Sequence, residues 1–362
     1  MERVLPARIY LDHAATTPVR PEAARAVAAG LAAWANPSSP HAEGRAARRA
    51  LEDARAAIGA AYGWTGQVLL TSGASESLAI ALGRSTARRS LISAVEHDAV
   101  HRAAAGTAVL PVEFSGLLSL EELRRALDKT GRALVAVQWA NSETGVRQPI
   151  ADVAEIVHAG GHLLLVDAAQ MPARSHDDAL THADMVALSA HKRGGPPGAG
   201  ALLVRDLGGL KPSGGQEFGY RAGTENLPAA LGYAAALAEP EPIARWAGLR
   251  ARLDDAIRRS NGQVVGDGSP RHPAIGSYRM TGVASAAQLI RFDLAGFAVS
   301  AGSACASGSM KPSHVLAAMG WTEQASREVV RVSFGRDTSE AELDAFIAAW
   351  RGIARATRSF AA

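Results

Sequence analysis

The sequence predicts an α/β fold, with a mainly parallel seven-stranded sheet in a large domain and a smaller α+β domain after it. Short apolar runs alternate with helical patterns over the first two thirds of the chain, as in a parallel sheet covered by helices on both faces. The alternation stops at the Pro-rich stretch 239–242, where we place a domain boundary. The predicted domains are residues 13–240, and residues 1–12 together with 241–362.

The individual elements follow from apolar spacing and from helix-start signals. The predicted strands of the large domain are 67–71, 90–94, 108–112, 133–139, 162–166, 184–189 and 200–204. Helices are predicted at 21–35, 42–61 and 120–129, and the last of these begins with Ser119 and Glu122 at capping-box spacing. The smaller domain is predicted to hold a helix at 242–259, strands at 274–280 and 329–334, and a final helix from about 339.

Composition indicates an ordinary soluble protein. Of the 362 residues, 48% are apolar and 20% are charged, and the net charge of +3 comes from dispersed residues rather than from a basic stripe. We therefore predict no direct nucleic-acid binding. Cys305 is the one cysteine, which favours a reducing compartment, and no apolar run is long enough for a signal peptide or a membrane span. A cytoplasmic location is predicted.

Lys192 is the first candidate for chemistry. The apolar strand 184–189 ends directly in Ser189, His191 and Lys192, and a Gly/Pro-rich turn follows. Ligands of α/β sheets bind at strand carboxyl ends, where partial burial lowers the pKa of an amine and makes it a usable Schiff-base nucleophile. The alternative is a surface lysine that happens to follow a strand.

Asp167 ends a second apolar strand, 25 positions earlier. A carboxylate there can pair with the protonated ring nitrogen of pyridoxal phosphate, and Gln170 is close enough in sequence to reach the ring hydroxyl. The alternative for Asp167 alone is an N-cap after a strand. An acid at one strand end and a His-Lys pair at another form the combination that pyridoxal-phosphate enzymes require.

A phosphate site is predicted at residues 70–77, where a strand, a glycine turn and a helix start follow one another. Free backbone N–H groups and the helix dipole favour an anion there, and Ser72 and Ser75 add hydroxyl donors. Ser189 and His191 can contribute further donors from beside Lys192. Taken alone, a Ser-Gly turn is a weak signal.

Together these motifs resemble the cysteine desulfurases, the NifS/IscS-like branch of the class-V aminotransferases. The resemblance covers nearly the whole chain through the segments 10–18, 36–39, 71–77, 96–97, 141–145, 167–170, 189–192, 214–217, 221–224, 303–307 and 331–336. It implies the type I fold of pyridoxal-phosphate enzymes and pyridoxal 5'-phosphate as the cofactor. Nothing in these motifs predicts a metal site.

The resemblance implies a role for each matching residue. Lys192 would bind the cofactor covalently, Asp167 would pair with its pyridine nitrogen, Gln170 would contact its ring oxygen, and His97 would stack on the ring and assist proton transfer. The residues implied to bind the phosphate are Ala74, Ser75, Ser189, His191 and, from the partner subunit of a homodimer, Thr224. Without the resemblance, His97 could be an ordinary helix-start histidine.

Asn141 and Arg331 are implied to hold the carboxylate of the substrate. From the residues alone, Asn141 could be a turn residue and Arg331 could serve an ordinary ion pair. Glu217 and Arg221 fit structural or interface positions, and we assign no chemistry to them.

Cys305 distinguishes desulfuration from transamination. It lies in the segment 300–309, which consists almost wholly of Gly, Ala and Ser and is typical of an exposed loop rather than of a core. A thiol there can attack the sulfur of L-cysteine, leaving L-alanine and a persulfide on Cys305 for a sulfur-acceptor protein. The alternative is a bystander thiol.

The function predicted from the sequence is therefore cysteine desulfurase activity. The sulfur acceptor is left open among iron–sulfur scaffolds, tRNA thiolation and other thiocofactor pathways. One alternative is a class-V aminotransferase or selenocysteine lyase, which keeps Lys192 and Asp167 but does not need Cys305. A remote alternative is a catalytically silent sulfur-transfer scaffold.

Overall fold

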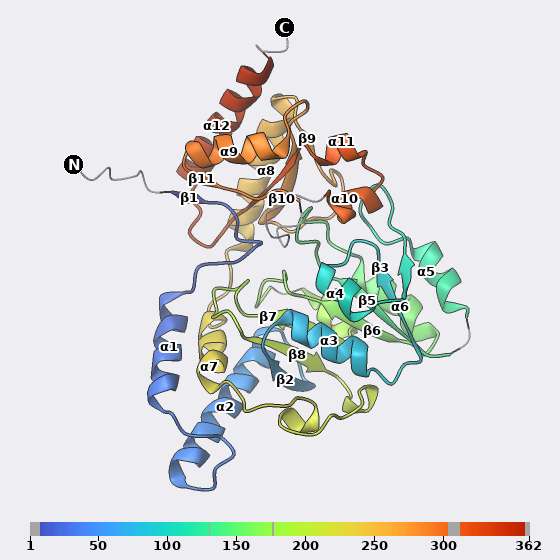
Figure 1. Ribbon diagram of the computed structural model, residues 1–362, viewed down its shortest axis with the longest axis vertical. Coiled ribbons are helices and arrows are strands. Elements are labelled where there is room, and N and C mark those ends of the chain that lie inside the picture. Colours follow the sequence, from blue (N-terminus) through green and yellow to red (C-terminus); the bar gives the residue numbers. More distant parts are fainter. Residues whose placement is uncertain (1–7, 130, 176, 303–311, 359–362) are drawn as a thin grey trace, which may run out of the picture.

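The computed structural model describes residues 8–129, 131–175, 177–302 and 312–358 (Figure 1). The strands of the central sheet are β2 (Gln67–Thr71), β3 (Arg89–Ser93), β4 (Ala108–Leu110), β5 (Ala133–Gln138), β6 (Leu163–Asp167), β7 (Met185–Ser189) and β8 (Gly200–Val204). The helices around it are α1 (Pro21–Ala32), α2 (Ala42–Ala61), α3 (Ala74–Arg84), α4 (Asp98–Ala103), α5 (Leu120–Leu127), α6 (Ile150–Ala159) and α7 (Leu227–Ala236), with short 3-10 helices η1 (Asp178–His182), η2 (Leu207–Gly209) and η3 (Glu217–Gly219).

The seven strands lie in the order β2-β8-β7-β6-β5-β3-β4. The run from β7 to β4 is parallel, whereas β8 is antiparallel to both of its neighbours. The predicted seven-stranded, mainly parallel sheet is therefore confirmed. The exception at β8 has a simple cause, because only residues 190–199 join it to β7, and a parallel connection needs a longer crossover.

Helices cover both faces of this sheet. Along β5, Val135 and Val137 belong to a core shared with α2, α5, α6 and α7, whereas Leu134 and Ala136 belong to a second core shared with α3 and α4. This alternation explains why the strand reads as a continuous apolar run in the sequence. Helix α1 lies against α7 and ends at Ala32, three residues before the predicted end, since Trp34 has a φ of 36°.

A second group of elements lies above the central sheet in the view of Figure 1. It consists of α8 (Ile243–Arg259), β9 (Gln263–Val264), β10 (Ile275–Arg279), α9 (Ser285–Leu294), β11 (Phe297–Ala298), α10 (His314–Ala318), α11 (Glu323–Ser326), β12 (Val329–Ser333) and α12 (Glu340–Arg358). An antiparallel sheet has the order β12-β10-β9, and the N-terminal strand β1 (Ile9–Tyr10) pairs with β11 in parallel. A capping box precedes α12, with Ser339 and Glu342 bonded reciprocally.

The two groups have separate hydrophobic cores. One large cluster of buried residues comes from α8, α9, α12 and the strands β10 to β12, and it includes Leu11 from the N-terminal segment. We therefore propose the two domains predicted from the sequence, residues 13–240 and residues 1–12 together with 241–362. Within the residues described, no helix combines the length and the apolar character needed to cross a membrane.

Candidate active site

Lys192 and Asp167 meet at one edge of the central sheet. Asp167 closes β6 and is aligned with Ala187 of β7, and the chain reaches Lys192 three residues after β7 ends. The amine of Lys192 donates to the backbone carbonyl of Ala14, and Nε2 of Gln170 donates to the same oxygen at 3.0 Å. Residues far apart in the sequence thus converge on one backbone carbonyl of the N-terminal segment.

Asp167 and His97 share an electrostatic environment with Lys192. Burial raises the pKa of the Asp167 carboxyl, while the backbone N–H of Ala169, His97 and Lys192 oppose this shift. Burial lowers the pKa of His97, Asp167 counteracts it, and the cation of Lys192 lowers it further. Because Nδ1 of His97 accepts a hydrogen bond from the backbone N–H of Ala99 at 3.1 Å, the proton of the neutral ring lies on Nε2.

The predicted phosphate site is formed by a close approach of two glycines. A Cβ on Gly200 would lie 2.5 Å from Cα of Gly73, so the turn before α3 can come this near to β8 only because residue 200 has no side chain. Gly200 is aligned with Ser189 on one side and with Thr71 on the other. The turn therefore brings the N-terminus of α3, where Ala74 is half-buried and Ser75 is exposed, to the end of β7.

His191 is the other predicted phosphate ligand near Lys192. Its Nδ1 lies 3.1 Å from the hydroxyl of Thr16, and burial together with the cations of Lys192 and Arg193 lowers its pKa to about 4. At neutral pH the ring is therefore uncharged, and it can donate one hydrogen bond but adds no positive charge. Phosphate binding by His191 stays a prediction.

Arg331 and Asn141 lie at neighbouring positions, but both side chains already have partners. Nη2 of Arg331 donates to Asp12 at 2.6 Å, and Nη1 donates to the carbonyl of Ser142 at 3.0 Å. The amide of Asn141 donates to the carbonyl of Val95, and its oxygen accepts three hydrogen bonds within its own turn. Substrate binding by the two residues stays a prediction, and for Asn141 these contacts describe a turn-stabilising residue.

Two further predicted site residues stay untested. Thr224 is exposed in the segment that leads to α7. Cys305 lies outside the described residues, and its place relative to Lys192 is not part of the structure.

Comparisons with known proteins show the family of the chain. Residues 9–346 match the family described as Aminotransferase class-V. The chain belongs to the class-V aminotransferase family. It is 38% identical over 93% of its length to a protein of Cereibacter sphaeroides named cysteine desulfurase, and the match covers 93% of that protein.

Other class-V aminotransferases are similar along the whole chain. An IscS-like cysteine desulfurase of Mycobacterium tuberculosis is 35% identical, with 97% of each chain covered. The solved structure of a NifS-like protein from Rickettsia africae superposes with a TM-score of 0.85 at 28% identity, covering 96% of this chain and 99% of that one. The type I fold and the desulfurase-like branch predicted from the sequence are thereby confirmed.

Class-V aminotransferases depend on pyridoxal phosphate, and the residues of this chain fit that group. Lys192 offers an amine at the carboxyl end of the sheet, Asp167 offers a buried carboxyl, and Gly73 caps the N-terminus of α3, where free backbone N–H groups can bind a phosphate. The buried oxygen of Gln170 has no hydrogen-bond partner among the described residues, which leaves it available to a bound group. When bound, the cofactor supplies the electron sink for carbanion chemistry.

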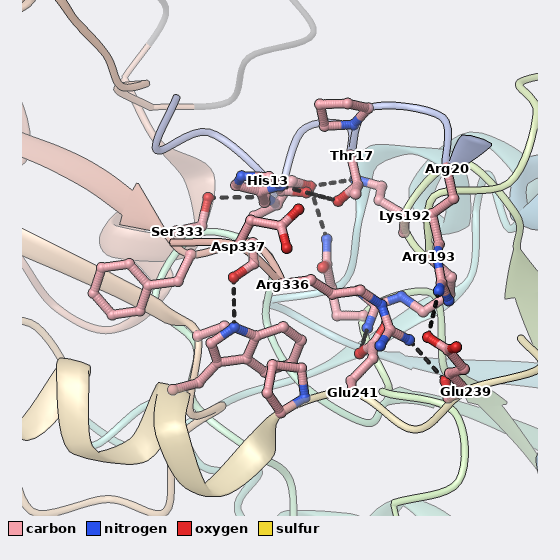
Figure 2. A pocket seen from close by; sticks show the side chains of 18 of the residues that line it. His13, Thr17, Arg20, Lys192, Arg193, Glu239, Glu241, Ser333, Arg336 and Asp337 are labelled. Atoms are coloured by element: carbon pink, nitrogen blue, oxygen red, sulfur yellow. Dashed lines mark hydrogen bonds and ion pairs between the residues drawn. The ribbon is translucent and has the colours of Figure 1, made fainter. Parts of the chain in front are cut away.

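A cavity of about 780 Å³ lies beside this class-V site (Figure 2). It is bordered by the N-terminal segment around His13, by the stretch 239–242 and by residues 333–337. Its wall contains the ion pairs of Arg20 with Glu239 and of Arg193 with Glu241, each 2.7 Å long. Lys192 also lines it, so Lys192 is common to this cavity and to the group of charges around Asp167.

Glu96, a fully buried acid next to His97, has no role predicted from its sequence context. Its Oε1 accepts the backbone N–H of Gln138 at 2.9 Å, and Gln138 is aligned with Asp167 in the sheet. Burial, and then the negative charge of Asp167, raises the pKa of Glu96 well above its ordinary value. No periodicity marks such a residue, because its partners lie on two other segments of the chain.

Replacing Glu96 with glutamine is expected to flatten the pH dependence of stability. An acid with a raised pKa contributes stability fully below its unfolded-state pKa, and this contribution is lost as the pH rises through the folded-state pKa. Glutamine keeps the acceptor for Gln138 but does not ionise. As the pH rises from 5 to 8, the melting temperature of the cofactor-free Glu96→Gln variant should therefore fall less than that of the cofactor-free wild type. The exposed control Glu121→Gln should follow wild type, and identical profiles for wild type and Glu96→Gln would contradict the assignment.

Proposed function

We propose that this protein is a pyridoxal-phosphate-dependent cysteine desulfurase that converts L-cysteine to L-alanine and receives the sulfur on Cys305. The observation that carries the proposal is the convergence of Lys192, Asp167 and His97 at one sheet edge, in a chain that matches cysteine desulfurases over nearly its whole length. Cys305 is the one thiol available to take up sulfur.

The proposed reaction balances without an added oxidant. An S–S bond forms between Sγ of Cys305 and Sγ of the substrate, and the Cβ–Sγ bond of the substrate breaks. The electron pair of the broken bond stays on Cβ, which takes up a proton and becomes the methyl group of L-alanine. The cysteine residue is left as a persulfide, which a second thiol or an acceptor protein can reduce or remove.

Each residue of the site has a proposed task in this reaction. Lys192 would hold the cofactor and accept the Cα proton of the substrate, because its half-buried amine lies at the carboxyl end of the sheet beside the site proposed for the ring. Asp167 provides the negative charge that keeps the ring nitrogen protonated. His97, whose Nε2 carries the proton in the neutral ring, can donate a proton where the carbon–sulfur bond breaks.

The biological setting is also proposed rather than observed. We infer a homodimer in which Thr224 reaches the phosphate of the partner's cofactor, and a cytoplasmic location. The persulfide would be passed to an acceptor protein, either an iron–sulfur scaffold or a sulfur carrier for thiocofactor synthesis or tRNA thiolation. The names of the relatives, which include an IscS-like protein, support the iron–sulfur assignment.

The test is to incubate the cofactor-loaded protein with L-cysteine and a thiol reductant and to quantify sulfide and L-alanine. Wild type should form the two products in equal amounts. Cys305→Ser should lose at least about 99% of both, since the persulfide-forming nucleophile is gone, while the absorption of the bound cofactor is unchanged. A cofactor-loaded wild type that yields no sulfide but transfers the amino group would instead establish a transaminase.

A further inference from the structure

Asp12 joins three segments that meet at the edge of the site. Its Oδ1 accepts a hydrogen bond from Nη2 of Arg331 at 2.6 Å, and its Oδ2 accepts one from the hydroxyl of Ser300 at 3.1 Å. The ion pair is largely withdrawn from solvent, with the side chains of Arg331 and Asp12 exposed by 5% and 18%. A contact of this kind between a carboxylate and a guanidinium is stronger than a surface ion pair.

Arg331 is held at both ends of its guanidinium. Nη2 is bonded to Asp12 and Nη1 to the carbonyl of Ser142, whereas the buried Nε has no hydrogen-bond partner among the described residues. The backbone of Arg331 also exchanges two hydrogen bonds with Ser300. The side chain is therefore fixed in one orientation while part of its donor capacity is unused.

The N-terminal segment links this arginine to the cofactor lysine. The backbone N–H of Ala14 donates to the hydroxyl of Ser333 at 2.8 Å, and the carbonyl of Ala14 accepts from Lys192. Ser333 and Arg331 are alternate residues of β12, so their side chains lie on the same face of that strand. Asp12 and Ala14 thus connect Arg331 and Lys192 through adjoining contacts.

We propose that Asp12 is the positioning residue of Arg331, holding its guanidinium ready for the carboxylate of the amino-acid substrate. This inference rests on the proposed function and goes beyond it, because Asp12 acts through Arg331 and not on the reacting atoms. An arginine that is already fixed loses little side-chain freedom when the substrate binds, which increases affinity. Among the described residues, the guanidinium without Asp12 keeps the carbonyl of Ser142 as its one remaining hydrogen-bond partner.

The expected result for Asp12→Ala is a rise of about ten- to a hundredfold in the KM for L-cysteine, the range that the loss of a charge-assisted hydrogen bond gives, with kcat within about threefold of wild type. Asp12→Asn keeps an oxygen acceptor without the charge and should lie in between. If Asp12→Ala does not fold, the KM of Asp12→Asn for L-cysteine tests the proposal in its place. The Kd for L-alanine, followed by the change in cofactor absorption, should rise in parallel and needs no turnover.

A double-mutant cycle separates positioning from general damage to the fold. If Asp12 acts through Arg331, adding Asp12→Ala to Arg331→Ala should raise the Kd for L-alanine no further. As a control, Asp344→Asn removes an exposed ion pair with Arg252 elsewhere in the same domain and should leave the Kd and KM unchanged. Additive effects in the cycle, or a lower KM in Asp12→Ala, would overturn the proposal. A wild type that binds L-alanine but releases no sulfide would contradict the proposed function. The Kd values for L-alanine would then still test whether Asp12 positions Arg331.

Discussion

Replacing Lys192 with alanine is expected to lower sulfide release from L-cysteine by at least about a thousandfold. In the proposed reaction the amine of Lys192 both holds the cofactor covalently and moves the Cα proton. Positioned proton transfer alone accelerates a reaction by about 10² to 10⁴. Its neighbours in the structure fit both tasks, since the amine contacts the carbonyl of Ala14 and is electrostatically coupled to Asp167 and His97. The measurement is sulfide and L-alanine production by the cofactor-supplemented variant.

The matched control is Lys129→Ala, because Lys129 is an exposed lysine that follows α5 and has no predicted role in the site. It should keep wild-type activity and the absorption band of lysine-bound cofactor, whereas Lys192→Ala should lose that band. Retention of both the band and the activity in Lys192→Ala would show that another amine binds the cofactor. A variant that loses activity but keeps the band would restrict the role of Lys192 to proton transfer.

The sheet and the two main site residues could be predicted because their signals are local. Asp167 and Lys192 each follow an apolar run, and parallel strands bring their carboxyl ends to one edge whatever the rest of the chain does. The antiparallel course of β8 was not specified in this way, because its apolar run reads the same in either direction. The two-residue strands β9 and β11 are too short to show any periodicity.

The contacts that complete the site could not be predicted from patterns. Lys192 bonds to a carbonyl 178 positions away, and Arg331 pairs with an acid 319 positions away. Ala14 takes part only through its backbone, which every residue possesses, so its side chain carries no signal. Glu96 is buried by segments distant in the sequence, and only the assembled fold gives it a raised pKa.

Glu217 connects the edge of the central sheet to helix α2 through a buried network. Its Oε2 accepts hydrogen bonds from the backbone N–H of Leu70, at 2.8 Å, and from Nη1 of Arg55, and its Oε1 accepts one from Nη2 of Arg55 at 3.1 Å. The side chain of Glu217 is fully buried, and its φ of 51° lies in the left-handed region that non-glycine residues rarely adopt. These contacts therefore hold an otherwise unfavourable backbone in place.

Removing this carboxylate in Glu217→Ala is expected to lower the free energy of unfolding by about 3 kcal/mol, the lower end for a broken buried ion pair, because the guanidinium of Arg55 loses its fully buried partner but keeps the more exposed Glu52. Urea denaturation of the cofactor-free protein measures the change. Glu323→Ala, which removes an exposed pair with Arg327, should cost less than about 1 kcal/mol. If Glu217→Ala also lowered the free energy of unfolding by less than about 1 kcal/mol, the structural role of Glu217 would be contradicted. Because Leu70 lies shortly before the turn at Gly73, Glu217→Ala should also weaken cofactor binding, which ties the stability of this sheet edge to the phosphate site.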